Sequence, residues 1–358
     1  MAKQRNSGIE LLRIIAILMV ILYHWVWHGG IRTFSGYEFG ANIVFMQFLM
    51  TLGRTGCCIF ALITGYFMIS SQKKNYYPKV ISLTLTTHMY YLMILAVMFV
   101  TKAVPVSKTL GIKSLLPLLF GTWYIIAYIL LLLIVPFLNP WLRQLDQKTH
   151  LRLTVTLLVI WSVIPTVSAG AWSFSDIDFF LVMYVLGSYL RLHPIERKLP
   201  WGIMALGSWI LMFLSVIGFD ILGIITDRKG LFDKAFYFGK LNSVIAVFLS
   251  VSMLMWCSRM KFQSRIVNTL GGTTLGIYLI HNNFLLRNWA FRKVFPNLSY
   301  IENPYLNVLA KTAVIFFAGA AVELIRAATV GKLFDRIGDR IGNRIDKNQM
   351  SGSAQETK

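Results

Sequence analysis

The sequence is poor in cysteine and in charged residues. Cys57, Cys58 and Cys257 are the three cysteines among 358 residues. They lie in apolar segments without metal-ligand spacing, which excludes a disulfide framework and predicts a packing role. Charged residues make up 14 % of the chain and hydrophobic residues 56 %. This balance excludes a soluble globular protein of this length and indicates several membrane spans.

Motifs for metal or serine catalysis are also missing. The sequence has no HExxH pattern and no acidic cluster near its histidines, so no metal site is predicted. No serine elbow accompanies the histidines, which argues against a Ser-His-Asp site. The formal charge is +20, but the lysines and arginines stand in short clusters between apolar runs. That distribution predicts membrane topology and a lipid bilayer partner, and no nucleic-acid partner.

Ten apolar runs have roughly the length that crosses a bilayer. They cover residues 10–27, 50–69, 80–101, 116–138, 152–169, 177–191, 203–225, 241–257, 267–286 and 306–328. The chain is therefore predicted to be an all-α polytopic membrane protein with about ten transmembrane helices. The long stretch before Met50 leaves room for a separate re-entrant or interfacial helix over 41–49.

The loops between these runs predict the orientation of the chain. An even number of spans puts both termini on one side, and the segments on that side carry most of the lysines and arginines. Both termini are therefore predicted to be cytoplasmic. Residues 1–330 form the predicted transmembrane domain. Residues 331–358 form a basic cytoplasmic tail, predicted as an interfacial helix followed by the disordered end SGSAQETK.

The first run, ELLRIIAILMVILYHW, contains two groups that hydrocarbon disfavours, Arg13 and His24. Eleven positions on a helix return to within about 20° of the same face and rise about 16 Å. An ionisable group inside a span costs about 3 kcal/mol, so both residues are predicted to be functional. The alternative for Arg13 is snorkelling to the headgroups from the first turn.

Further candidates lie on both predicted sides of the membrane. On the cytoplasmic side, Lys73, Lys74 and Lys79 are suited to hold the phosphates of a nucleotide-like cofactor, although orientation alone also explains them. On the outer side, a polar pocket is predicted at the depth of His24. Its predicted members are His281, Asn282, Trp123, Tyr124 and Arg54. Aromatic anchoring and headgroup contacts are the competing interpretations, and a stacking platform for a sugar ring is the functional one.

Several motifs are similar to those of a known family. They are an arginine followed by ten residues and a histidine (Arg13 and His24), then TGYFM, WYIIAYILLLLIVPFL, FLVMYVLGSYL and LGIYLIHN. In this order and spacing they resemble the membrane-integral acyltransferase type 3 family, which acylates bacterial surface polysaccharides and related glycans. The resemblance covers roughly residues 6 to 325.

The resemblance implies an O-acyltransferase of the bacterial plasma membrane. Its donor would be cytoplasmic acyl-coenzyme A, usually acetyl-CoA, and its acceptor a hydroxyl of a cell-surface or lipid-linked glycan. Arg13 would help to hold coenzyme A, and His24 would act in acyl transfer as general base or acyl carrier. The chain departs from the family at Thr64, Gly65 and Tyr66, where Ser-Gly-Phe is frequent, and in its lysines, where the family often has an arginine-rich run.

Two other functions use the same residues. In a transporter or flippase for a glycan or small solute, Arg13 and His24 would be gating or proton-relay groups. The resemblance argues against this alternative, as does the lack of evident paired broken helices. In a structural partner of a polysaccharide assembly complex, neither residue would matter. The residues specify neither the acceptor glycan nor the oligomeric state.

Overall fold

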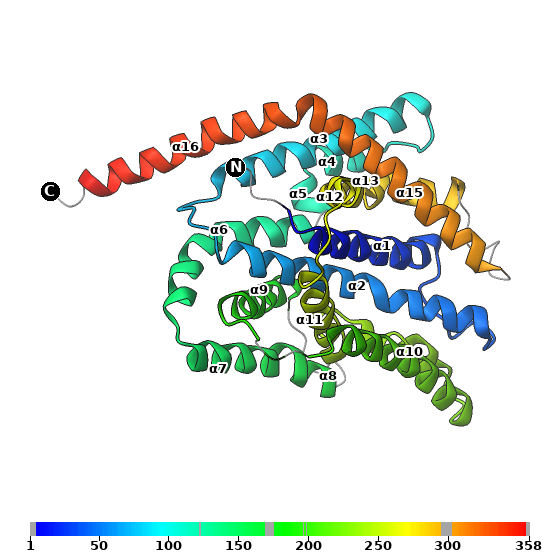
Figure 1. The fold of residues 1–358 in the computed structure, drawn as a ribbon. Helices are drawn as coiled ribbons and strands as arrows, with labels where there is room; N and C mark the ends of the chain where they lie inside the picture. Colours follow the sequence, from blue (N-terminus) through cyan, green and yellow to red (C-terminus); the bar gives the residue numbers. More distant parts are fainter. Residues whose placement is uncertain are drawn as a thin grey trace.

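The computed structural model describes residues 5–121, 123–168, 175–195, 197, 199–294 and 303–355. Helices and loops make up these residues, and no strand occurs among them. The predicted all-α class is confirmed. The first two helices, α1 (Ser7–Gly29) and α2 (Ala41–Met68), pack against each other in the middle of the bundle (Figure 1).

The other helices surround this central pair. The longer ones are α3 (Tyr77–Thr101), α6 (Trp123–Gln144), α7 (Gln147–Leu158), α9 (Asp176–Leu192), α10 (Trp201–Ile225), α11 (Val244–Ser258), α15 (Pro304–Arg326) and α16 (Lys332–Gln355). The shorter ones are α4 (Lys108–Leu115), α5 (Pro117–Phe120), α8 (Ile164–Val167), α12 (Arg265–Gly272), α13 (Thr274–His281) and α14 (Phe284–Trp289). Single π-helical turns join α7 to α8 and α15 to α16, and a further one follows α14.

Among the described residues, 8 helical stretches are long and apolar enough to cross a membrane. They are Ser7–Gly29, Ala41–Met68, Tyr77–Thr101, Trp123–Gln144, Gln147–Val167, Trp201–Ile225, Lys229–Ser258 and Pro304–Asp346. The multi-pass character of the chain is thus confirmed. The count of about ten stays a prediction, because α9, in the sixth predicted run, has 17 residues, and the ninth predicted run is divided.

Two predicted elements differ in the structure. The separate helix over 41–49 is wrong, because α2 runs without a break from Ala41, directly after Gly40. The single span over 267–286 is also wrong, because it consists of α12, α13 and the start of α14. Here Asn283 starts a new helix, since its side-chain oxygen accepts from the backbone N–H of Leu285 at 2.9 Å.

The start of α1 and the end of α16 lie at the same end of the bundle, called here the terminal end (Figure 1). Helix α16 continues from α15 and packs on α3, where the Ser82 hydroxyl donates to Asp335 at 2.7 Å. The cytoplasmic location of this end stays a prediction, as does the division of the chain at residue 330. Of the predicted disordered end, 351–355 belong to α16, and 356–358 lie outside the described residues.

Glycines permit the close approach of the central helices. A Cβ atom on Gly56 of α2 would lie 2.6 Å from the Ala16 carbonyl oxygen of α1. A Cβ atom on Gly187 of α9 would lie 2.5 Å from the Leu62 carbonyl oxygen and 2.8 Å from the Tyr66 nitrogen, both on α2. Small residues at such crossings allow backbone contact between membrane helices. The backbones of α1, α2 and α9 are therefore held in fixed register.

Gly187→Ala is expected to destabilise the protein, because its methyl group meets α2 backbone that cannot move aside. Overpacking of this kind costs about 1–3 kcal/mol. Gly207→Ala on α10 is the matched control, since a Cβ atom there meets nothing within 4 Å. The control is expected to be neutral or slightly stabilising. Thermal melting of the purified variants in detergent measures both effects, and equal melting temperatures would contradict the close α2–α9 contact.

Candidate active site

Two histidines from distant parts of the chain meet inside the bundle. His24 lies on α1 and His281 is the last residue of α13. Nδ1 of His24 lies 2.9 Å from Nε2 of His281, and both side chains are buried. The other ring nitrogen of His281, Nδ1, lies 2.6 Å from the carbonyl oxygen of Ile277, one helical turn earlier. The α13 backbone, His281 and His24 thus form one hydrogen-bonded chain.

This chain of hydrogen bonds assigns the protons of the two neutral rings. A carbonyl oxygen can only accept, so Nδ1 of His281 carries a hydrogen and donates it to Ile277. Nε2 of His281 is then an acceptor, and Nδ1 of His24 donates to it. Nε2 of His24 keeps its lone pair. It is therefore the ring nitrogen that can take a proton or attack an electrophile.

His24 lines a cavity of about 210 Å³, called here the His24 cavity. Its lining residues come mainly from α1 and α2, with single residues from α6, α13 and α14. They are Val20, Tyr23, His24, Trp27, His28, Gly53, Arg54, Cys57, Gly121, Trp123, Tyr278, Asn282 and Arg287. Arg54 and Arg287 supply positive charge, and none of these described lining residues is an aspartate or glutamate. The walls combine indole rings with cationic and imidazole groups.

Polar contacts hold the arginines of the His24 cavity in place. Nη1 of Arg287 donates to Oδ1 of Asn282 at 3.2 Å, and Nδ2 of Asn282 donates to the Tyr278 hydroxyl at 3.1 Å. The Arg54 guanidinium lies 5.0 Å from the ring centre of Trp123, which places it within cation–π range. Arg287 is therefore oriented by a neutral amide, and Arg54 lies beside an indole ring.

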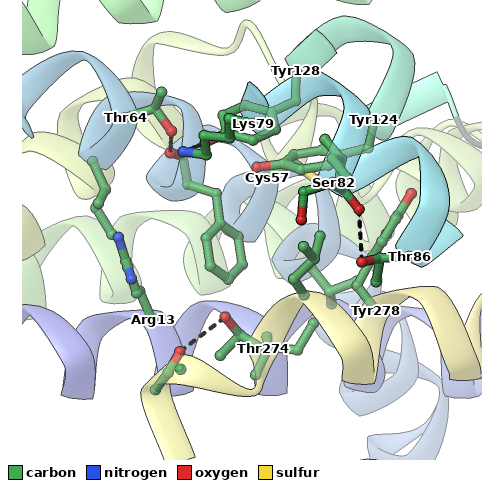
Figure 2. A pocket seen from close by; sticks show the side chains of 18 of the residues that line it. Arg13, Cys57, Thr64, Lys79, Ser82, Thr86, Tyr124, Tyr128, Thr274 and Tyr278 are labelled. Carbon is green, nitrogen blue, oxygen red and sulfur yellow. Dashed lines mark hydrogen bonds between the residues drawn. The ribbon is translucent and has the colours of Figure 1, made fainter. Parts of the chain in front are cut away.

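A second cavity, of about 390 Å³, lies toward the terminal end and is called here the Arg13 cavity (Figure 2). Its lining combines apolar residues with hydroxyls and charges. The residues are Arg13, Ile17, Val20, Cys57, Phe60, Ile63, Thr64, Lys79, Ser82, Leu83, Thr86, Tyr124, Tyr128, Gly271, Gly272, Thr274, Leu275, Tyr278, Arg326 and Asp335. Three cations stand against one carboxylate in this set. The cavity is therefore suited to an elongated, partly apolar anion.

The three cations of the Arg13 cavity have different neighbours. Arg326 forms a two-pronged ion pair with Glu323, at 2.9 and 2.7 Å, and Glu323 also accepts from the Tyr90 hydroxyl. Nη1 of Arg13 lies 3.5 Å from Glu10, and a third of the side chain is exposed. Nζ of Lys79 donates to the Tyr128 hydroxyl at 2.5 Å. Arg13 and Lys79 thus remain available to an anion.

The two cavities adjoin inside the bundle. Val20, Cys57 and Tyr278 line both of them. Arg13 and His24 lie on one helix, with a rise of about 16 Å between them. A molecule in the Arg13 cavity therefore needs to pass only this shared wall to reach His24.

Comparison with known proteins agrees with this arrangement. The model of the acyltransferase 3 family, described as an acyltransferase domain, matches residues 6–325. The chain belongs to the acyltransferase 3 family. The comparisons with curated proteins and with solved structures gave no match. The recognition of this family from the sequence motifs is confirmed. The protein is therefore a multi-pass membrane acyltransferase.

Most residues proposed for the acceptor pocket of this acyltransferase do lie around the His24 cavity. Arg54, Trp123 and Asn282 line it. His281 lies behind His24 and contacts it directly. Tyr124 differs from the expectation, because it lines the Arg13 cavity. Successive residues of a helix point about 100° apart, so neighbours such as Trp123 and Tyr124 face different cavities.

Two of the four predicted donor-binding residues line a cavity, and two do not. Arg13 and Lys79 line the Arg13 cavity. Lys73 and Lys74 are exposed in the segment between α2 and α3 and line neither cavity. Lys79 differs from them because it lies in the first turn of α3 itself, where its Nζ donates to the Tyr128 hydroxyl. A contact of Lys73 and Lys74 with the donor stays a prediction.

Sequence reasoning missed two arginines of this acyltransferase and one histidine, His28. Arg326 had a usable signal, since Glu323 stands three positions before it inside an apolar run, which is the spacing of a helical ion pair. Arg287 had no such signal in the sequence. The helix break after α13, which turns Arg287 toward the His24 cavity, is not evident from the hydrophobic periodicity. His28 lies one turn after His24 and lines the same cavity, with ring centres 4.6 Å apart.

His281→Leu is expected to lower acyl transfer about 100-fold, because His24 loses the acceptor that fixes its tautomer. His281→Gln is the matched variant, since its side-chain oxygen can accept the same proton, and it is expected to restore part of the rate. Transfer rates of the purified variants, compared at equal folded protein by size-exclusion chromatography, measure this. Equal losses in both variants would contradict a role in orienting His24.

Proposed function

We propose that this acyltransferase moves an acyl group, most simply acetyl, from acyl-coenzyme A to a hydroxyl of a cell-surface or lipid-linked glycan. The observation that carries the proposal is the pair of adjoining cavities, one cationic and partly apolar, the other containing His24 and indole rings. The donor occupies the first cavity and the acceptor the second. The protein lies in a bacterial plasma membrane with its terminal end in the cytoplasm.

Coenzyme A matches the chemistry of the Arg13 cavity. Its phosphates would contact Arg13 and Lys79, whose charges are not neutralised by close two-pronged ion pairs. Its pantetheine arm would lie along the apolar wall that includes Ile17, Leu83 and Leu275. The thioester would then reach the wall shared by the two cavities, next to Tyr278.

His24 supplies the acid–base chemistry in this proposal. Its Nε2 takes the proton of the acceptor hydroxyl as the hydroxyl oxygen attacks the thioester carbonyl carbon. The carbon–sulfur bond then breaks, and the coenzyme A thiolate takes the proton from the imidazolium. The products are the O-acyl glycan and coenzyme A. His281 holds the ring throughout by accepting from Nδ1.

The same atom also permits a covalent route. Nε2 of His24 attacks the thioester carbonyl carbon, the carbon–sulfur bond breaks, and coenzyme A leaves as a thiolate that takes a proton from water. The acceptor hydroxyl then attacks the acyl-imidazolium, the imidazole leaves, and the hydroxyl proton is released to water. The two routes differ in kinetics. The covalent route releases a burst of coenzyme A before any acceptor is added and gives ping-pong kinetics, whereas the general-base route requires both substrates together.

His24→Ala is expected to abolish glycan acylation, with a loss of at least about 100-fold, because the Nε2 atom that takes the hydroxyl proton is removed. His88→Ala is the matched control. His88 lies on α3, its ring faces the Thr84 carbonyl, and it lines neither cavity. Mass spectrometry of surface glycans and acyl-coenzyme A turnover by purified protein measure the effect.

Two outcomes would overturn this function. Retained acylation in His24→Ala would remove the role of the histidine. Solute flux into liposomes without acyl-coenzyme A turnover would identify a transporter or flippase, in which the histidine relays protons. If the protein were a structural partner of an assembly complex, His24→Ala would change neither surface-glycan acylation nor acyl-coenzyme A turnover.

Arg13→Ala is expected to raise KM for acyl-coenzyme A about tenfold and to change kcat less, because one charge-assisted contact to phosphate is lost. Lys148→Ala, an exposed cation outside both cavities, is the matched control and is expected to leave KM unchanged. Steady-state kinetics with varied acyl-coenzyme A measure both. An unchanged KM in Arg13→Ala would show that the donor does not contact this residue.

A further inference from the structure

We propose that the acceptor is an anionic sugar, whose carboxylate or phosphate binds Arg287 and Arg54 while a neighbouring hydroxyl reaches His24. The inference rests on the proposed function and adds the chemical class of its acceptor. It is carried by the charge of the His24 cavity. Both arginines line that cavity, and no aspartate or glutamate occurs among its described lining residues.

Arg287 has the clearest need for an anion. Its contact in the described part of the chain is the neutral amide oxygen of Asn282 at 3.2 Å. Its Nε atom is buried and has no hydrogen-bond partner among the described residues. A guanidinium that loses water without gaining a carboxylate is costly. The fork of an arginine, with Nε and Nη donors side by side, matches a carboxylate or phosphate in two-pronged geometry.

The walls of the His24 cavity fit the rest of a sugar. Trp27 and Trp123 both line it, and indole faces pack against the C–H faces of sugar rings. The Arg54 guanidinium rests 5.0 Å from the centre of the Trp123 ring, so one cation is held beside one stacking surface. An anionic group attached to a sugar ring would satisfy both features at once.

The proposed chemistry also favours an anion at this position. When Nε2 of His24 takes the hydroxyl proton, the imidazole becomes positive in a cavity that already contains two guanidinium groups, while the matching negative charge moves to the thioester oxygen and then to the leaving sulfur. Two like charges a few ångströms apart in a protein interior repel by several kcal/mol. A carboxylate or phosphate bound by the arginines offsets this repulsion. The acceptor thus supplies a counter-charge that the described lining residues do not.

The test is equilibrium binding of three small probes to the purified full-length protein in detergent micelles. The probes are methyl β-glucuronide, glucose 1-phosphate and methyl β-glucoside, which carry a carboxylate, a phosphate and no charge. We expect at least one charged probe to bind about tenfold more tightly than the neutral one. Whether the carboxylate or the phosphate probe binds better identifies the source of the anion.

Two arginine variants locate the effect. Arg287→Gln is expected to remove the preference for the charged probe while binding of the neutral probe changes less than about twofold. Arg32→Gln is the matched control, because it removes the same charge at a residue that does not line the cavity. Arg32 is exposed and lies over the Trp27 ring. It is expected to keep the preference. Retained folding of both variants is checked by size-exclusion chromatography.

Several results would overturn the proposal. One is equal binding of charged and neutral probes, or binding of none. Another is an equal effect of Arg32→Gln and Arg287→Gln. Displacement of the charged probe by coenzyme A in the Arg13→Ala protein would also overturn it, because Arg287 would then hold the donor. Acylation of neutral glycans as efficient as that of anionic ones would refute the anionic acceptor and leave the proposed acyl transfer intact.

Discussion

The contact between His24 and His281 is the constraint on which the rest of the site depends. Two imidazoles buried in a membrane-type helical bundle are tolerated only when their polar atoms are satisfied. The backbone of α13 supplies one partner, because the Ile277 carbonyl accepts a hydrogen bond from His281. This hydrogen bond makes Nε2 of His281 an acceptor for His24, and so fixes Nε2 of His24 as the atom that keeps a lone pair. The end of α13 must therefore reach α1, and the break at Asn283 lets the chain turn away directly afterwards.

The wall between the two cavities follows from the same packing. Val20 of α1, Cys57 of α2 and Tyr278 of α13 line both cavities, so three helices meet where the acyl group would change partners. Gly56, next to Cys57, lets α2 approach α1 at Ala16 closely enough for this. In the proposed function, donor and acceptor meet across side chains only, and neither substrate has to cross the membrane.

The sequence predicted those features that depend on one helix at a time. The all-α class and the common face of Arg13 and His24 follow from apolar length and helical period. The partner of His24 did not follow, because it lies 257 positions away and is chosen by the packing of α13 on α1. That Tyr124 lines the Arg13 cavity, while Trp123 lines the His24 cavity, did not follow from the sequence for a related reason. Depth in a membrane can be estimated from a sequence, whereas the face that a helix turns to each neighbour depends on all helices together.

The arginines that line the two cavities differ in how completely the described residues neutralise their charge. Arg326 is neutralised by Glu323, so its ion pair is complete without a ligand. Arg13 has a longer contact with Glu10 and remains partly exposed. Arg287 has a neutral amide as its partner and a buried Nε without one. Because an unpaired cation is costly in a low-dielectric interior, this gradient from Arg326 to Arg287 supports the proposed anionic substrates, and most strongly so in the cavity that contains His24.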